Sequence, residues 1–102
     1  ALRRDRDDVA RPGVDPQVHR STVETPQVEL TAVAVKNYAE AVEVCQGLVD
    51  EGIVAIELCG GFGHIGAARV AQAVGAKAAV GVVRFDNHPG LEFKSGDALF
   101  GS

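Results

Sequence analysis

Three short segments rich in β-branched residues recur along this chain at an almost constant interval. They are residues 28–35 (VELTAVAV), 53–58 (IVAIEL) and 79–85 (AVGVVRF), and they begin 25 and 26 residues apart. Because residues with helical periodicity lie between them, the repeating unit is a strand followed by a helix, and such strands run parallel through right-handed crossovers. The rhythm therefore predicts an α/β fold: a small three-layer domain with three or four parallel strands and crossover helices.

The first helix is predicted to begin after Asn37, which can form a capping box with Glu40 three residues later. Gly52 is typical of a position just past a helix end. The side chains at helical spacing that should form its buried face are Ala41, Val42, Cys45, Leu48 and Val49. This pattern puts Cys45 in the core.

A second helix is predicted over residues 64–74, with Gly75 as its stop. A third, shorter helix is expected near the start of the chain, because Asp15 can cap it, Pro16 suits its first turn and residues 18–23 could continue it. The residues expected on the buried face of the second helix are Ile65, Ala68, Ala71 and Val74.

The same rhythm predicts a fourth strand at about residues 2–9, where the sequence reads LRRDRDDV. Charged residues dominate this stretch, which makes it a poor buried strand. Residues 1–13 are therefore interpreted as a charged arm or a poorly formed edge strand, and residues 14–102 as a single α/β domain. The turn-rich end of that domain is expected to fold over the sheet or onto a neighbouring subunit. Its apolar anchors would be Leu91, Phe93, Leu99 and Phe100.

Charge and hydropathy favour some partner classes over others. The net charge is −4, so no face is expected to bind nucleic-acid phosphates. No apolar run approaches the roughly 20 residues of a membrane span, and the polar start does not resemble a secretory signal. We therefore expect a cytoplasmic protein without nucleic-acid or membrane partners, and its two cysteines should be reduced thiols.

The size of the chain favours self-association. A domain of 102 residues buries only roughly two-thirds of the surface that its unfolded chain exposes. Its helices are rich in alanine, which contributes little apolar area. A homo-oligomer is therefore expected.

A glycine-rich motif occupies residues 57–66, which read ELCGGFGHIG and contain G-x-G-x-x-G. The loop should leave the carboxyl end of a strand and open a helix, where backbone N–H groups can bind a phosphate or carboxylate. Three interpretations are open: a dinucleotide site, a site for a smaller anionic or phosphorylated ligand, and a tight turn without a ligand. Asp86, 20 residues beyond Gly66, fits the ribose-binding acid of a dinucleotide site, although only one such unit fits in the chain.

The predicted ligand-binding residues belong to this loop or follow the next strand, and no particular cofactor is indicated. They are Gly60, Gly61, Phe62, Gly63, His64, Gly66, Arg84 and Asp86.

Three residues near the same edge are candidates for catalysis. Cys59 precedes a helix start, where the dipole lowers a thiol pKa, although the role of a small apolar filler is favoured for it. His64 in the first helical turn should stay neutral and could hydrogen-bond a substrate oxygen, or it could be an exposed polar residue. His88 is unexpected in the turn DNHPG. Two histidines with Asp86 could form a facial metal triad, but their spacing is not diagnostic, and no metal is predicted.

The stretch IELCGGFGHIGAARVAQAVGAKAAVGVVRFDNHPG resembles a family of short bacterial α/β proteins classed as a domain of unknown function. In that family, runs like IELCGGFG, GAARVAEAVG, VGVVRFD and HPG occur in this order, and the resemblance covers about residues 14–100. It implies a fold but no reaction. Family members begin with an apolar strand, where this chain has ALRRDRDDVARPG. The positions that match the family's motif are Glu57, Cys59, Gly60, Gly61, Phe62, Gly63, Gly66, Arg84, Asp86, His88 and Pro89.

Three functions follow as hypotheses. The first is binding of a small anionic or phosphorylated ligand at the glycine-rich loop. The second is an enzyme that acts on a small carbonyl or phosphorylated substrate. The third is a structural or accessory subunit whose polar residues build an oligomer interface.

Overall fold

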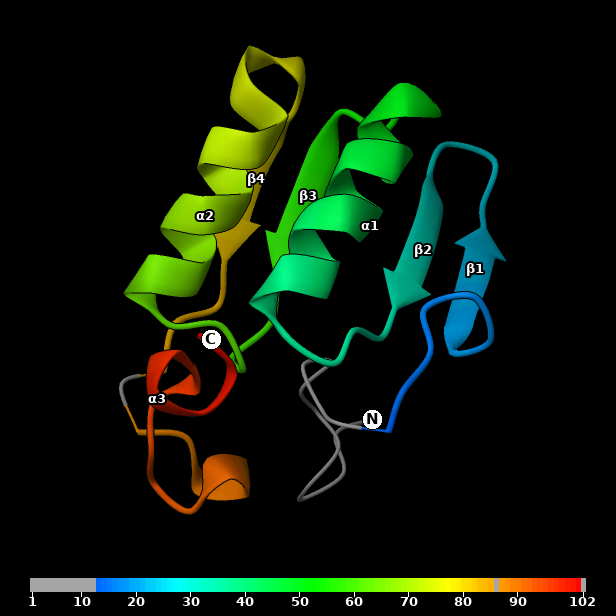
Figure 1. The fold of residues 1–102 in the computed structure, drawn as a ribbon. Helices are drawn as coiled ribbons and strands as arrows, with labels where there is room; N and C mark the ends of the chain where they lie inside the picture. Colours follow the sequence, from blue (N-terminus) through cyan, green and yellow to red (C-terminus); the bar gives the residue numbers. More distant parts are fainter. Residues whose placement is uncertain (1–12, 86, 102) are drawn as a thin grey trace.

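The computed structural model describes residues 13–85 and 87–101 of the chain, whose path Figure 1 shows. Three α-helices and four strands alternate through most of this length, which confirms the predicted mixture of helix and strand. In chain order the elements are β1 (Arg20–Glu24), β2 (Glu29–Val33), α1 (Tyr38–Asp50), β3 (Ala55–Leu58), α2 (His64–Val74), η1 (Gly75–Lys77), β4 (Ala79–Val82), η2 (Pro89–Leu91) and α3 (Gly96–Phe100).

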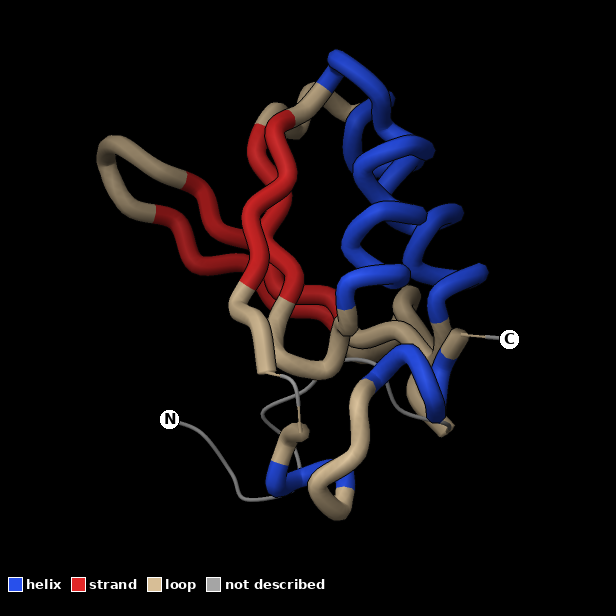
Figure 2. Tube along the Cα trace, turned by 90° about the vertical axis from the view of Figure 1, so that its left-hand side faces the viewer, coloured by secondary structure: helices blue, strands red, loops and turns tan. Residues whose placement is uncertain are grey.

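The strands form two separate pairs. β1 and β2 make an antiparallel hairpin, whereas β3 and β4 are parallel neighbours. Helices α1 and α2 lie side by side over one face of the strands (Figures 1 and 2). The described residues thus form two layers rather than the predicted three. The physical reason is that successive right-handed crossovers stepping in one direction place their helices on the same face.

The helix predicted to start at Asp15 and Pro16 and to continue over residues 18–23 is not formed: residues 20–24 belong to the strand β1 instead. Asp15 does cap a turn, because its Oδ1 accepts a hydrogen bond from the amide of Gln17 at 2.9 Å. The chain then leaves the turn and pairs with β2, and the hydroxyls of Thr22 and Thr31 hydrogen-bond across the pair at 3.0 Å. The hairpin partner therefore outweighs the local helix-start signal.

The predicted boundaries of α1 are confirmed. The side chain of Asn37 accepts a hydrogen bond from the amide of Glu40 at 2.9 Å. The Glu40 carboxylate reaches back to the amide of Lys36 at 2.9 Å, one residue earlier than in a standard capping box. Gly52 follows the helix end with a φ of 100°, a conformation that suits glycine.

Helix α2 has the predicted bounds but buries a different face. Val70 and Val74 are buried together with Gly66, whereas Ile65 is 59% exposed. The predicted stripe is thus wrong except at Val74, and Ala68 and Ala71 are also exposed. Most side chains of α2 are small, so its sequence pattern defines the apolar face poorly.

The core lies between the helices and β3 and reaches the carboxyl-terminal tail. Cys45 is buried there, as predicted, and burial raises the pKa of its thiol. Leu91 and Phe100 are buried tail anchors, which confirms two of the four predicted; Phe93 and Leu99 are exposed. The buried apolar cluster consists of Val35, Tyr38, Ala41, Cys45, Ile56, Leu58, Phe62, Val70, Val74, Leu91 and Phe100.

Some predictions lie outside the described residues. They are the strand at residues 2–9, the charged arm up to residue 12, and the role of Asp86. Within the described parts of the chain, no helix has the length and apolar character needed to cross a membrane.

Candidate functional site

The glycine loop connects β3 to α2 and is packed inside the molecule. Gly60, Gly61, Phe62 and Gly63 are all buried. The ring of Phe62 stacks on Tyr38 with 5.4 Å between centroids and 12° between planes. This packing holds the loop against the start of α1.

A carboxylate from the tail caps the amino end of α2. Asp97, in α3, accepts hydrogen bonds from the amide of Ile65 at 3.2 Å and from the amide of Gly66 at 3.1 Å. These are first-turn N–H groups of the kind that bind anions at helix starts. The Asp97 carboxylate thus accepts hydrogen bonds from two amides at the helix start. The sequence motif had predicted that amides of this kind bind an external ligand.

Tyr38 links the loop to the same carboxylate. Its hydroxyl donates to Asp97 Oδ1 at 2.8 Å and accepts from the amide of Gly63 at 2.9 Å. Tyr38 is 0% exposed. Burial first, and then the adjacent Asp97 carboxylate, raise the pKa of Tyr38 to about 12, although the Gly63 hydrogen bond and Arg84 act in the opposite direction. The hydroxyl therefore remains protonated and can donate at neutral pH.

Hydrogen bonding outweighs desolvation at Asp97. Burial by itself would raise the pKa of this carboxyl group, but three hydrogen bonds and the charge of Arg84 hold it below its ordinary value. The donors are the Ile65 amide, the Tyr38 hydroxyl and the Gly66 amide. Asp97 is therefore ionised at neutral pH and complements the positive end of the helix.

Two glycines of the motif make room for this arrangement. A Cβ on Gly63 would overlap the carboxyl group of Asp97, and a Cβ on Gly66 would overlap the ring of Tyr38. In the tail, a Cβ on Gly96 would overlap the carbonyl oxygen of Gly61. At these positions the missing side chain is required by contacts within the protein.

His64 and Arg84 meet at the exposed edge of the site. Arg84 Nε donates to His64 Nδ1 at 3.1 Å. His64 opens α2, and Arg84 follows β4, so two segments 20 residues apart in sequence supply the pair. The charge of Arg84 also acts on both Tyr38 and Asp97. The structure thus brings together two predicted site residues beside the start of α2.

His88 lies in the interior rather than on an open surface. It is 3% exposed, and its Nδ1 accepts a hydrogen bond from the amide of Gly90 at 2.8 Å. Its ring lies 4.5 Å from that of Phe85, and a Cβ on Gly60 would overlap both rings. Cys59 is half-buried and follows directly after β3. Catalytic roles for His64, His88 and Cys59 stay predictions.

Sequence reasoning missed Tyr38 and Asp97, which organise this region. Each follows a helix-start signal: Tyr38 comes directly after Asn37, and Asp97 lies two residues after Ser95, whose hydroxyl caps α3. Tyr38 is also the only tyrosine in the chain. These signals mark helix starts, but nothing local indicates that the two side chains meet. Within the described residues, no group of three or more potential metal ligands is gathered.

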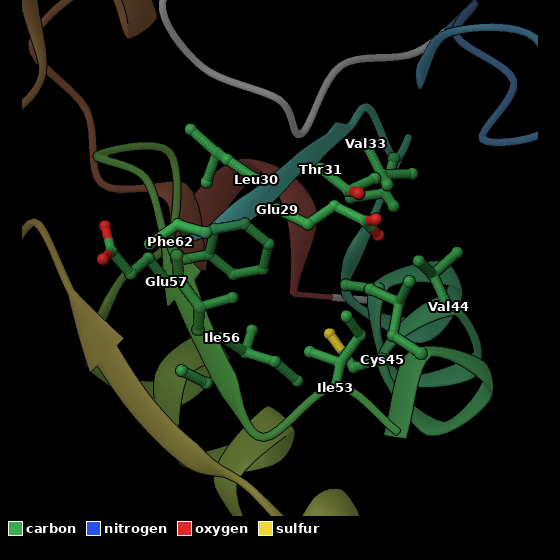
Figure 3. A pocket seen from close by; sticks show the side chains of 16 residues that line it. Glu29, Leu30, Thr31, Val33, Val44, Cys45, Ile53, Ile56, Glu57 and Phe62 are labelled. Carbon is green, nitrogen blue, oxygen red and sulfur yellow. The ribbon is translucent and has the colours of Figure 1, made fainter. Parts of the chain in front are cut away.

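A separate cavity of about 300 Å³ lies between β2 and β3. Figure 3 shows Ile56 and Cys45 pointing into this space and Glu57 pointing away from it. Glu57 is exposed, so the strand does not bury its carboxylate. The cavity wall is mostly apolar and comes from both strands and from α1.

Comparison with protein families identifies a match over most of the chain. A family model described as a family of unknown function (DUF6506) matches residues 9–98 of the chain. No curated protein and no solved structure matches the chain.

Proposed function

We propose that this chain, which belongs to the family of unknown function DUF6506, binds a small anionic or phosphorylated ligand beside its glycine loop. The observation that carries the proposal is the hydrogen bond of 3.1 Å from Arg84 Nε to His64 Nδ1 at the amino end of α2. This pair combines a permanent positive charge with the positive end of a helix dipole.

The chemistry of the pair suits an oxyanion. A guanidinium group offers several N–H donors in one plane and matches the geometry of carboxylate and phosphate oxygens. Because His64 accepts through Nδ1, a neutral ring carries its proton on Nε2, which makes that atom a donor. Arg84 and His64 would therefore contact the ligand through their side chains.

The loop residues have a supporting role in this proposal. Asp97 already accepts hydrogen bonds from the amides of Ile65 and Gly66. Gly60, Gly61, Phe62, Gly63 and Gly66 would shape the site and position His64, while the ligand itself binds at the surface.

Inorganic phosphate is the probe that tests this function. We expect saturable binding in the millimolar range by calorimetry, and a loss of roughly tenfold or more in Arg84→Gln, because a charge-assisted hydrogen bond contributes about 1.5–3 kcal/mol. Arg20→Gln is the matched control, since Arg20 lies in the distant hairpin and donates to the carbonyl of Pro16. It removes the same charge and should leave phosphate binding within about twofold.

Two results would contradict the proposal. One is that neither phosphate nor a simple dicarboxylate such as succinate binds saturably to the wild-type protein. The other is equal weakening by Arg84→Gln and Arg20→Gln, which would indicate nonspecific attraction to positive charge. An enzyme that uses His64 or Cys59 on such a ligand is a further step that requires this binding first.

A second candidate function is that of a structural or accessory subunit in a homo-oligomer. Three neighbouring apolar side chains at and after the end of β4 favour it: Val82, Val83 and Phe85 are 49%, 54% and 39% exposed. An exposed apolar group of this kind is typical of an interface. We expect Val83→Asp to shift the sedimentation-equilibrium mass to that of the monomer, and Glu43→Gln on the exposed face of α1 to leave it unchanged. A monomeric wild-type protein would contradict this function.

A further inference from the structure

The cavity between β2 and β3 interrupts what would otherwise be one continuous sheet. β2 and β3 point in the same direction in Figure 1, and α1 connects them, yet they are not hydrogen-bonded to each other. In a split βαβ arrangement, the two strands of a strand–helix–strand unit are not neighbours in the sheet, and a further strand lies between them. The cavity occupies that position.

The backbone edge of β2 that faces the cavity follows from its pairing with β1. The amide of Ala34 donates to the carbonyl of His19, and Arg20 lies opposite Val33. Hydrogen-bonded pairs alternate along an antiparallel ladder. The backbone groups of Thr31 and Val33 therefore point away from β1 and toward the cavity.

The pairing of β3 with β4 shows in the same way which backbone groups of β3 face the cavity. The amide of Ala79 donates to the carbonyl of Val54, and the amide of Val83 donates to the carbonyl of Leu58. Alternate residues of a parallel strand bond to one neighbour, so the backbone groups of Ala55 and Glu57 point to the opposite side. Two strand edges thus face the same space. Within the described residues, these edges do not pair with each other.

We propose that this cavity, called the cleft between β2 and β3 from here on, is a strand-insertion site. It takes an extended apolar segment of another polypeptide by strand addition. The inserted strand would hydrogen-bond to β2 on one side and to β3 on the other, which would join the two pairs into one sheet. A segment of about five residues matches the length of β2.

The side chains around the cleft specify the character of the segment. Toward α1 the lining is apolar and includes Val44, Cys45 and Ile56, so alternate side chains of the inserted strand must be apolar. Glu29 begins β2 and lines the cleft, which places an acidic residue at one end of it, whereas the Glu57 side chain points away. A basic residue beside the apolar segment would complement Glu29.

The chain's own amino-terminal sequence does not have this character. Seven of its first eleven residues are charged, and burying such groups without partners costs several kcal/mol each. A separate polypeptide therefore suits the cleft better than residues 1–12.

A designed peptide tests the proposal on the full chain. The probe is KKVAVIVKK labelled with fluorescein, and the control is the same peptide with N-methyl groups on alternate backbone amides, which cannot form the strand ladder. We expect saturable binding of the first by fluorescence anisotropy and a loss of at least roughly tenfold for the second. Hydrogen exchange at the amides of Thr31, Val33, Ala55 and Glu57 should slow when the first peptide binds.

Two matched proline variants test the site from the side of the protein. Ala55→Pro removes a backbone donor that faces the cleft, and proline is tolerated where a strand N–H lacks a ladder partner. Val82→Pro makes the same change on the outer edge of β4. Circular dichroism should show that both variants fold. We expect Ala55→Pro to weaken peptide binding roughly tenfold, and Val82→Pro to leave it within about twofold.

Several outcomes would overturn the inference. One is that the peptide does not bind to the wild-type protein. Another is that the N-methylated peptide binds equally well, which would indicate a pocket for small apolar molecules. A third is that both proline variants weaken peptide binding equally. A wild-type dimer that dissociates when the peptide binds would instead assign the cleft to a second copy of this chain. The phosphate titration uses Arg84 and His64, so failure of one experiment does not imply failure of the other.

Discussion

Replacement of Gly66 by alanine is expected to lower the free energy of unfolding by roughly 2 kcal/mol. Helix propensity alone predicts the opposite, since alanine is favoured over glycine inside a helix by about 1 kcal/mol. The added Cβ, however, would overlap the ring of Tyr38, which is 0% exposed and stacked on Phe62. Overpacking of this kind costs typically about 1–3 kcal/mol, and a ring held on several sides favours the upper end. Urea unfolding of both proteins measures the difference.

Gly47→Ala is the control for this prediction. Gly47 lies inside α1, and a Cβ there would meet nothing within 4 Å. The same substitution should therefore stabilise the protein by roughly 0.5–1 kcal/mol. Stabilisation by Gly66→Ala would show that the ring of Tyr38 can move aside, and it would contradict the packing described for α2.

Replacement of Asp97 by alanine is expected to lower the free energy of unfolding by roughly 2–4 kcal/mol. The change removes an ionised acceptor from the amides of Ile65 and Gly66 and from the hydroxyl of Tyr38. The buried hydroxyl would lose its acceptor, which adds a desolvation cost. Urea unfolding at neutral pH measures the loss, and Glu43→Ala, at an exposed position of α1, should change the free energy by less than about 0.5 kcal/mol.

The same residue predicts a dependence of stability on pH. The folded protein holds the pKa of Asp97 below its ordinary value of 3.8, so its stabilising contribution is fully present above that value. The contribution should be lost as the pH falls through the lowered pKa of the folded state. Asp97→Asn should reduce the difference in stability between neutral and acidic pH. An unchanged difference in this variant would show that other carboxyl groups account for the acid sensitivity.

An exogenous anion offers an independent measure of what the start of α2 can bind. In Asp97→Ala, formate would find the amides of Ile65 and Gly66 without their internal acceptor. We expect formate to stabilise this variant more than the wild-type protein, after correction for the effect of the same salt on Glu43→Ala. Equal stabilisation of all three proteins would mean that the helix start holds only a tethered carboxylate.

The sequence predicted the elements whose signals are local. The start of α1 follows from Asn37 and Glu40, and the end of α2 from Gly75, because capping contacts join residues only a few positions apart. The strands β3 and β4 follow from their β-branched runs. Membership of an uncharacterised family was also readable from the motifs, and the family match confirms it.

The candidate site was readable only in part. The motif located the strand-to-helix turn, and the rhythm of strands brought His64 and Arg84 to the same edge. The acceptor at the helix start could not be deduced in this way. Asp97 lies 31 residues from Gly66 in sequence, and Tyr38 lies 25 residues from Gly63. A glycine that makes room for a ligand cannot be distinguished by sequence from a glycine that makes room for a residue of the tail.

By itself, then, the sequence determined the α/β character, the ends of α1 and α2, and the place of the glycine turn, because contacts within a few residues encode them. Tertiary structure decided three other features: the strand conformation of residues 20–24, the buried face of α2, and the carboxylate at its start. Each depends on a partner distant in sequence. Local propensities differ by about 1 kcal/mol or less, so one hydrogen-bonded or packed partner is enough to reverse them.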